Sequence, residues 1–116
     1  MANTFKVKTN AAMPASAGTF LTLYTCPAST QTIVIGLTLC NVHTTAVTAD
    51  VQLVSDTSDT ETNETVLIIN DVDIPAKSSL EVLSGGKYVL QATDVLQIDC
   101  SVAAKIDATL SILEIT

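Results

Sequence analysis

Most of this chain consists of short runs in which branched residues and threonines alternate with polar residues, and turn residues separate the runs. Branched β-carbons restrict χ1 and pack well on a pleated surface. A repeat of two residues places successive side chains on opposite faces of a strand, and no segment has the 3.6-residue repeat of an amphipathic helix. The sequence therefore predicts an all-β protein.

The first predicted strand, residues 4–9, places Phe5 and Val7 on one face and Lys6 and Lys8 on the other, as in an edge strand or an ordered arm. Residues 10–18 contain Pro and Gly and are predicted to form a loop. The other predicted strands are residues 19–26, 32–42, 45–54, 65–74, 79–83, 87–91, 93–102 and 106–115.

The alternation also predicts which side chains share a face. In residues 32–42 both faces are apolar or small, which indicates a central strand covered on both sides. One of its faces is predicted to hold Ile33, Ile35, Leu37 and Leu39. The predicted inward residues of three other strands are Val47, Ala49, Val51 and Leu53, then Leu96, Ile98, Cys100 and Val102, and finally Ile106, Ala108, Leu110 and Ile112.

Two local irregularities are predicted from residue types. Asn70 and Asp71 interrupt an apolar strand and indicate a β-bulge. The glycines of Ser84-Gly85-Gly86 indicate a tight turn, so residues 79–83 and 87–91 are expected to form a hairpin.

About eight or nine strands at this spacing predict a single-domain antiparallel β-sandwich of the jelly-roll or immunoglobulin-like kind, with a closed barrel as the alternative. The length of 116 residues suits one domain. Residues 1–18 are expected to form an N-terminal strand or arm and a loop, and residues 19–116 the sandwich itself.

Charge limits the partners that the chain can bind. It has twelve acidic residues, five lysines and no arginine, for a net charge of −7. Nucleic-acid binding rests on Lys and Arg at the phosphates, so this composition argues against it. No apolar stretch approaches the ~20 residues of a membrane span, and no secretion signal is found. We expect synthesis in a cytoplasm.

The three cysteines, Cys26, Cys40 and Cys100, are widely spaced and lie within or beside apolar runs. Their odd number and the lack of a Cys-x-x-Cys pair argue against a zinc site or a disulfide framework. They are predicted to be buried free thiols, with a Cys26–Cys40 disulfide as the alternative.

Four patterns in the sequence resemble parts of functional sites without matching them. His43 lacks a nucleophile or second histidine nearby in the sequence. Asp71 and Asp73 could form a carboxylate pair, but they fit the wet face of a strand. The Gly85-Gly86-Lys87 segment lacks the spacing of a phosphate loop. Four acids of the polar stretch at residues 55–64 lack the spacing of a calcium loop; they are Asp56, Asp59, Glu61 and Glu64. The sequence predicts no catalytic, cofactor or metal site, and no enzyme.

Five segments carry a resemblance to a known group of proteins. They are Leu-Tyr-Thr-x-Pro-Ala-x-Thr at 23–30, Ile-Val-Ile-Gly-Leu-x-Leu-x-Asn at 33–41, Ile-Pro-Ala-x-Ser-Ser-Leu at 74–80, Gly-Gly-Lys-x-Val-Leu at 85–90 and Asp-Val-Leu at 94–96. From residue 19 onward the chain resembles small virion structural proteins of tailed bacteriophages of marine and cyanobacterial hosts. These segments are strand and turn signals, and no functional motif accompanies them.

The resemblance implies a structural protein of the virion present in many copies. It implies most directly a capsid decoration, or cement, protein that binds the major capsid protein and forms a homo-oligomer, possibly a trimer. The alternative is a tail or neck adaptor, or a fibre-associated protein that binds the host. A carbohydrate-binding module is an unrelated third reading, but two Tyr, two Phe and no Trp offer few stacking surfaces.

Overall fold

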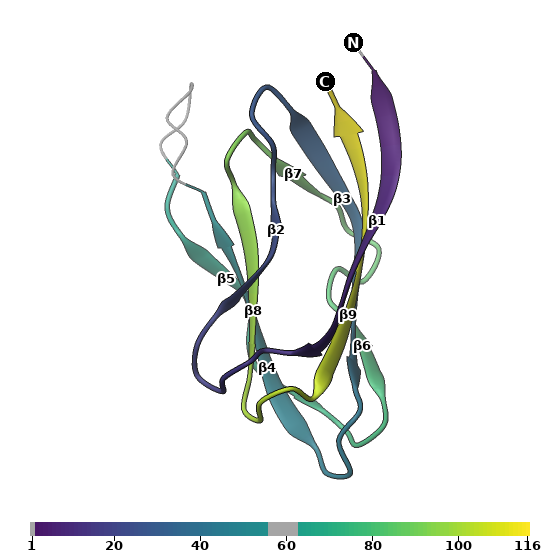
Figure 1. The fold of residues 1–116 in the computed structure, drawn as a ribbon, viewed down its shortest axis with the longest axis vertical. Helices are drawn as coiled ribbons and strands as arrows, with labels where there is room; N and C mark the ends of the chain where they lie inside the picture. Colours follow the sequence, from purple (N-terminus) through teal and green to yellow (C-terminus); the bar gives the residue numbers. More distant parts are fainter. Residues whose placement is uncertain (1, 56–62) are drawn as a thin grey trace.

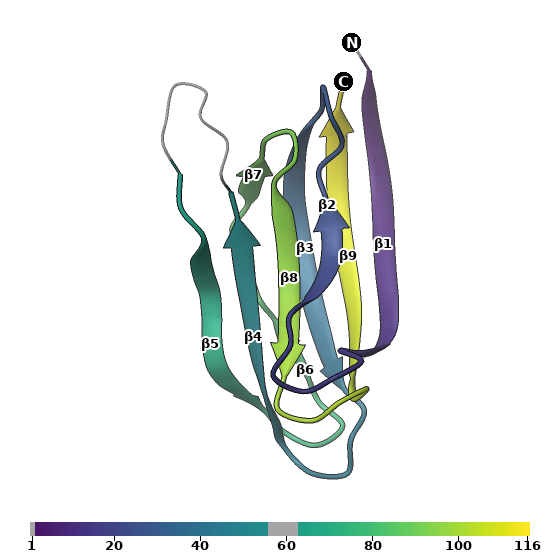
Figure 2. The same cartoon turned by 60° about the vertical axis from the view of Figure 1, so that its left-hand side comes forward.

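The computed structural model describes residues 2–55 and 63–116, which form nine β-strands and no helix. Figures 1 and 2 show the strands as two stacked layers. The strands are β1 (Asn3–Met13), β2 (Leu21–Thr25), β3 (Gln31–Asn41), β4 (Val47–Val54), β5 (Val66–Ile74), β6 (Ser79–Glu81), β7 (Tyr88–Leu90), β8 (Val95–Cys100) and β9 (Ile106–Ile115).

One layer, called sheet 1 below, has the order β1-β9-β3-β6, with β7 also paired to β3. The other, sheet 2, has the order β2-β8-β4-β5. Every pairing is antiparallel. The predicted class, an all-β antiparallel sandwich, is confirmed.

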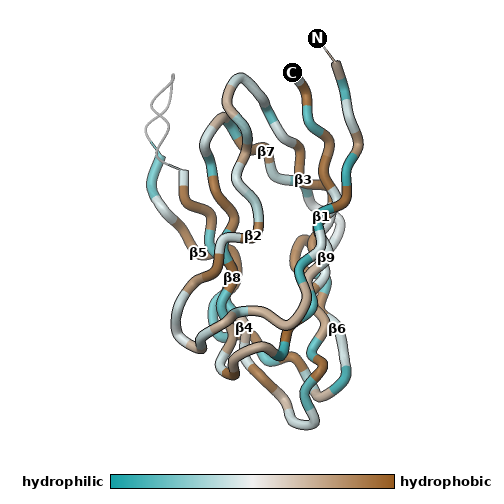
Figure 3. The backbone as a smooth tube through the Cα atoms, viewed as in Figure 1, coloured by the Kyte–Doolittle hydropathy of each residue, from teal (hydrophilic) through white to brown (hydrophobic). Residues whose placement is uncertain are grey.

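The core lies between the two sheets and follows the predicted alternation most closely in β9. Ile106, Ala108, Leu110 and Ile112 are each at most 2% exposed, as expected. Leu96, Ile98 and Cys100 of β8 and the first three predicted inward residues of β4 are buried as well, whereas Val102 lies after the end of β8 and, like Leu53, is half-buried. Figure 3 shows hydrophilic and hydrophobic residues alternating along the strands. Each sheet therefore has an inner apolar face, and the two faces pack on each other.

The predicted faces of β3 are wrong in its first half. A bulge between Val34 and Gly36 shifts the register against β9. Val34 is buried, as Leu37 is, whereas Ile35 is 37% exposed. The extra residue puts Ile35 and Gly36 on the outer side together, so the alternation restarts after them. β3 is central in sheet 1, as predicted, but within residues 2–55 and 63–116 no further layer covers its outer face.

The predicted hairpin of residues 79–83 and 87–91 is also wrong. β6 and β7 do not pair with each other; both pair with β3, β6 at Thr38–Cys40 and β7 at Thr32–Val34. They act as one interrupted edge strand. The turn at residues 83–86 does form, with the Gly86 N–H donating to the Leu83 carbonyl and positive φ at Ser84 and Gly85. The turn lies opposite the bulge in β3, so the edge formed by β6 and β7 is interrupted at that point.

The first strand is longer than predicted. β1 pairs with β9 from Asn3 to Asn10 and again at Met13, whose side chain is 1% exposed. It forms the edge of sheet 1, so the loop predicted from residue 10 begins only after Met13. The other predicted irregularity is confirmed: the register of β4 and β5 shifts around Asn70 and Asp71, and Asp71 has φ of 51°.

Asn41 ties the end of β3 to two other segments. Its side chain is fully buried, and its amide nitrogen donates to the carbonyls of Thr45 at 3.0 Å, Ile74 at 2.9 Å and Pro75 at 3.2 Å. Its Oδ1 accepts the N–H of His43 at 2.8 Å. The Asn41 side chain thus supplies hydrogen-bond partners to backbone groups at the end of the sandwich where the chain passes from β3 to β4 and where β5 ends.

We expect Asn41→Ala to lower the free energy of unfolding by about 2–4 kcal/mol, because it leaves buried carbonyls and an N–H without partners. Asn3→Ala, at the exposed end of β1, should change stability by less than about 0.5 kcal/mol. Urea denaturation of both variants checks this. Equal effects would contradict the role given to Asn41.

Candidate interaction surfaces

The residues weighed as catalytic candidates lie apart in the structure. His43 is half-buried in the turn after β3 and bonds Asn41 through its backbone. Asp71 and Asp73 are exposed on β5, and the Asp71 N–H donates to the Asp50 carboxylate. Asp56, Asp59 and Glu61 lie outside the described residues, and Glu64 is exposed. In the described ranges, no group of three His, Cys, Asp or Glu side chains could hold a metal ion.

The cysteines match the predicted burial in two of three cases. Cys26 and Cys100 are buried, whereas Cys40 is half-buried on the outer face of β3. All three are free thiols. Burial raises the pKa of the Cys26 and Cys100 thiols, which keeps them protonated and unreactive at neutral pH.

A polar network that the sequence did not predict closes the β1 side of the sandwich. The Tyr24 hydroxyl of β2 donates to Glu114 Oε2 of β9 at 2.6 Å and lies 2.9 Å from Thr32 Oγ1 of β3. Lys6 Nζ of β1 lies 2.8 Å from the other oxygen, Glu114 Oε1. Lys6 and Tyr24 thus bind the Glu114 carboxylate, and Thr32 joins the network through the Tyr24 hydroxyl, so side chains of four strands from both sheets are linked. The signal was present in the sequence: Glu114 continues the inward series of β9.

The network shifts the acidity of both its acids. The hydrogen bond from Lys6, followed by that from Tyr24, lowers the pKa of Glu114 from its ordinary 4.5. Burial, followed by the bond to Glu114, raises the pKa of Tyr24 well above its ordinary 10.0. Because folding lowers the pKa of Glu114, the ionised carboxylate stabilises the folded state at pH values above the pKa that it has in the unfolded chain. This stabilisation is lost as the pH falls through the lowered pKa of the folded state.

Glu114→Gln should therefore lower the free energy of unfolding by about 1.5–3 kcal/mol at pH 7, the range for hydrogen bonds to charged groups. The difference in unfolding free energy between the two proteins should shrink as the pH falls below 4.5 and through the lowered pKa of Glu114, because the wild-type carboxylate becomes protonated there. Urea denaturation at several pH values measures this. Glu64→Gln, at an exposed position, is the control, and a gap independent of pH would refute the role of the charge.

The outer edge of β1 presents unpaired backbone groups. Ala2 and Thr116 exchange both of their N–H···O=C bonds. Because bonded and non-bonded pairs alternate in an antiparallel ladder, residues 4, 6, 8 and 10 bond β9, and Asn3, Phe5, Val7 and Thr9 direct their N–H and C=O groups away from it. β1 ends the order of sheet 1. The edge is long, continuous and free of proline, which suits pairing with another strand.

The outer faces of the two sheets differ in character. On sheet 2, Asp50 of β4 is paired directly with Asp99 of β8, and the neighbouring Gln52 donates to Gln97 at 2.6 Å. On sheet 1, Phe5 and Val7 point outward, 74% and 65% exposed, while Lys6 and Lys8 point toward sheet 2. The predicted alternation of β1 is confirmed, with the apolar residues on the outside. Asp99 is only 8% exposed and accepts the Gly18 N–H, so sheet 2 carries polar pairs in its middle and exposes Val66 and Leu67 on β5, whereas sheet 1 exposes apolar residues on β1.

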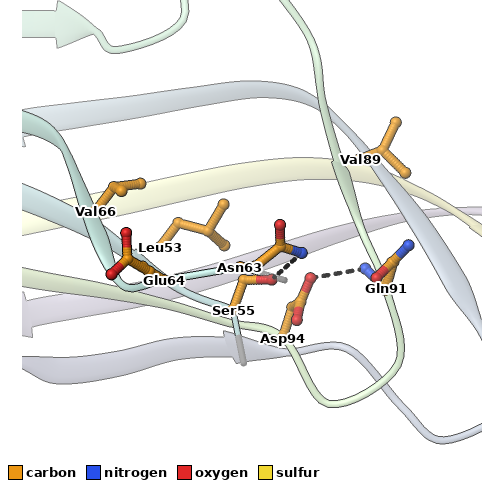
Figure 4. A pocket seen from close by; sticks show the side chains of 8 residues that line it. All are labelled: Leu53, Ser55, Asn63, Glu64, Val66, Val89, Gln91 and Asp94. Carbon is orange, nitrogen blue, oxygen red and sulfur yellow. Dashed lines mark hydrogen bonds between the residues drawn. The ribbon is translucent and has the colours of Figure 1, made fainter. Parts of the chain in front are cut away.

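A depression of about 440 Å³ lies where β4 and β5 of sheet 2 approach the segment after β7. Figure 4 shows its lining side chains, with Asn63 bonded to Ser55 and the carboxylate of Asp94 accepting the N–H of Gln91. The walls mix valine and leucine with these polar groups. The polar groups bond one another, and no concentration of reactive groups is seen among the described residues of the wall.

No protein-family model matches the chain, and no curated protein matches its sequence. A solved structure does share the fold; its title is "Bacillus endospore appendages form a novel family of disulfide-linked pili". The match covers 99% of this chain and 87% of that one, with a TM-score of 0.53 and 15% identity. At this identity the likeness shows the fold alone. No helix of the described part is long and apolar enough to cross a membrane.

Proposed function

We propose that this chain is a structural protein of a virus particle, and that it stabilises the capsid by joining neighbouring copies of the major capsid protein. The observation that carries the proposal is the free edge of β1, where four residues offer N–H and C=O groups to a further strand. Strand addition to such an edge gives affinity through main-chain hydrogen bonds without any reactive group. The protein then acts as a binding subunit and not as an enzyme.

Two further features support this role. The exposed apolar side chains of Phe5 and Val7 on the outer face of sheet 1 suit contact with protein. The network around Glu114 fixes β1 to the rest of the sandwich, so the edge is presented in one geometry. A preformed edge loses little conformational entropy when it binds. The virus particle and the major capsid protein are proposed as location and partner because the sequence resembles virion proteins of bacteriophages.

Proline substitution tests the edge directly. Thr9→Pro removes an N–H that points away from β9, so we expect the fold to be kept and binding to fail. Lys8→Pro is the matched contrast, because it removes a hydrogen bond between β1 and β9 and should destabilise the protein by about 1–3 kcal/mol. Binding is measured by co-sedimentation with shells of the same virus assembled without this protein. Undiminished binding of Thr9→Pro would refute strand addition at β1.

The number of copies per particle tests the position. A decoration protein should be present in hundreds of copies, whereas a tail or neck adaptor or a fibre-associated protein should be present in a dozen or fewer. Quantitative mass spectrometry of purified virions, with the major capsid protein as internal reference, separates these positions. A low count would replace the capsid role by the tail or neck role.

The structural neighbour favours a second candidate, a subunit of a filament. That structure comes from disulfide-linked pili, and this chain has three free cysteines, with Cys40 half-buried on an outer face. Electron microscopy of the isolated protein after oxidation distinguishes the two. Filaments that dissolve on reduction would support the pilus-like role, and their absence together with capsid binding would support decoration.

A further inference from the structure

Lysine is distributed unevenly over the strands of this chain. The sequence has five lysines, and the two that lie in strands, Lys6 and Lys8, are both in β1. β1 contains no acidic residue, whereas every other charged residue of the nine described strands is an aspartate or a glutamate. Among these strands β1 is therefore the one basic strand, in a chain whose net charge is −7.

The two sides of β1 offer different side chains to a strand that is added at its free edge. Phe5 and Val7 form an apolar row on the outer side, where they are 74% and 65% exposed. Lys6 and Lys8 are paired with buried residues of β9, so they lie on the side that faces sheet 2. Both lysines are nevertheless exposed. An added strand therefore meets apolar residues on one of its sides and ammonium groups on the other.

The free edge of β1 has a surplus of positive charge. Lys6 is bonded to Glu114, yet its side chain is 53% exposed and an ammonium has three donors, so it can bond a second carboxylate. Within the described part of the chain Lys8 makes no ion pair. The other acid of the neighbouring strand β9, Asp107, accepts a backbone N–H near the far end of β1 at 2.8 Å. The charge of Lys8 is thus left for a partner.

A depression of about 450 Å³ lies beside the two lysines, where β1 and β2 approach each other. The residues that β2 contributes to its lining are uncharged; they are Thr22, Leu23, Tyr24 and Thr25. Among the described lining residues the acid is Glu114, which is already bonded to Lys6 and to the Tyr24 hydroxyl. Side chains of an added strand that point toward sheet 2 reach this depression. Acidic groups there meet Lys8 without a competing carboxylate.

The charges also argue against a second copy of β1 as the added strand. The residues with free bonding groups are Asn3, Phe5, Val7 and Thr9. An antiparallel pair of two β1 strands that joins all four residues in both copies places Lys6 of one copy directly opposite Lys6 of the other. Like charges directly opposite each other destabilise a sheet. A strand with acidic residues at these positions replaces the repulsion by attraction.

We propose that the segment which adds to β1 alternates apolar and acidic residues over four positions. Its apolar side chains lie beside Phe5 and Val7, and its acidic side chains lie beside Lys6 and Lys8. The inference rests on the proposed strand addition and names the chemistry of the partner segment. Main-chain hydrogen bonds hold such a segment, and its alternate side chains give specificity.

Two peptides test the proposal with the full chain and without a virus particle. Both are acetylated and amidated at their ends, and their sequences are Thr-Val-Glu-Val-Glu-Val-Thr and Thr-Val-Lys-Val-Lys-Val-Thr. We expect the Glu peptide to bind at least about fivefold more tightly, because two pairs of opposite charge replace two pairs of like charge. The net charge of −7 favours the opposite order. A preference for the Glu peptide therefore reports the local charge of its binding site.

Amide NMR of the isotopically labelled chain, titrated with each peptide, measures the affinity and the place of binding. The N–H groups of Phe5, Val7 and Thr9 should shift most, since they point toward the added strand. Lys8→Glu should abolish the preference for the Glu peptide. Lys87→Glu makes the same charge change at an exposed position before β7 and should leave the preference unchanged. Added salt should reduce the preference, because it screens exposed charges.

The outcomes separate this inference from the capsid role. Equal binding of the two peptides, or a preference for the Lys peptide, overturns the acidic partner and leaves strand addition standing. Binding of neither peptide at about 5 mM, above the dissociation constants of weak complexes, overturns both the acidic partner and strand addition at β1. Selective binding of the Glu peptide that is lost in Thr9→Pro supports the inference. If shells of the virus then fail to bind the unchanged chain, the capsid role alone is refuted.

Discussion

Sheet 1 depends on the strict alternation of β9, which pairs with β1 on one side and with β3 on the other. A slip of one residue in this strand would turn its buried isoleucines and leucine out to solvent, so its register is fixed by burial. The register of β9 then sets that of both neighbours. Three consequences follow from this one strand: the buried carboxylate of Glu114, the inward lysines of β1, and the apolar row outside.

The sequence predicted the features that depend on the local alternation of apolar and polar residues. It did not predict the features that depend on which strands pair with each other. The bounds of β9 were predicted to the residue, and the bulge at Asn70 and Asp71 was recognised from two polar residues in an apolar strand. The bulge in β3 is marked only by Gly36 within an apolar run, a signal that the prediction from alternation passed over. The glycine turn was found, but the partner of its two flanking strands was not. A turn fixes only the local direction of the chain, and both flanking strands paired with the free edge of β3 and not with each other.

The candidate surfaces were predicted less completely than the fold. The faces of β1 were correct in composition, yet nothing local shows which face is inward; only pairing with β9 does. Phe5 and Val7 would pass for core residues in the sequence, and they lie outside because the pair partners Leu113 and Ser111 lie outside. The Tyr24, Glu114 and Lys6 network joins residues up to 108 positions apart and shows the same limit.

The interruption between β6 and β7 gives sheet 1 two unlike rims. Along β1 the backbone is continuous from Asn3 to Asn10, whereas along the opposite rim the hydrogen-bonding groups are broken by the turn at residues 83–86. The β1 rim therefore presents a longer uninterrupted run of hydrogen-bonding groups to an added strand than the opposite rim does.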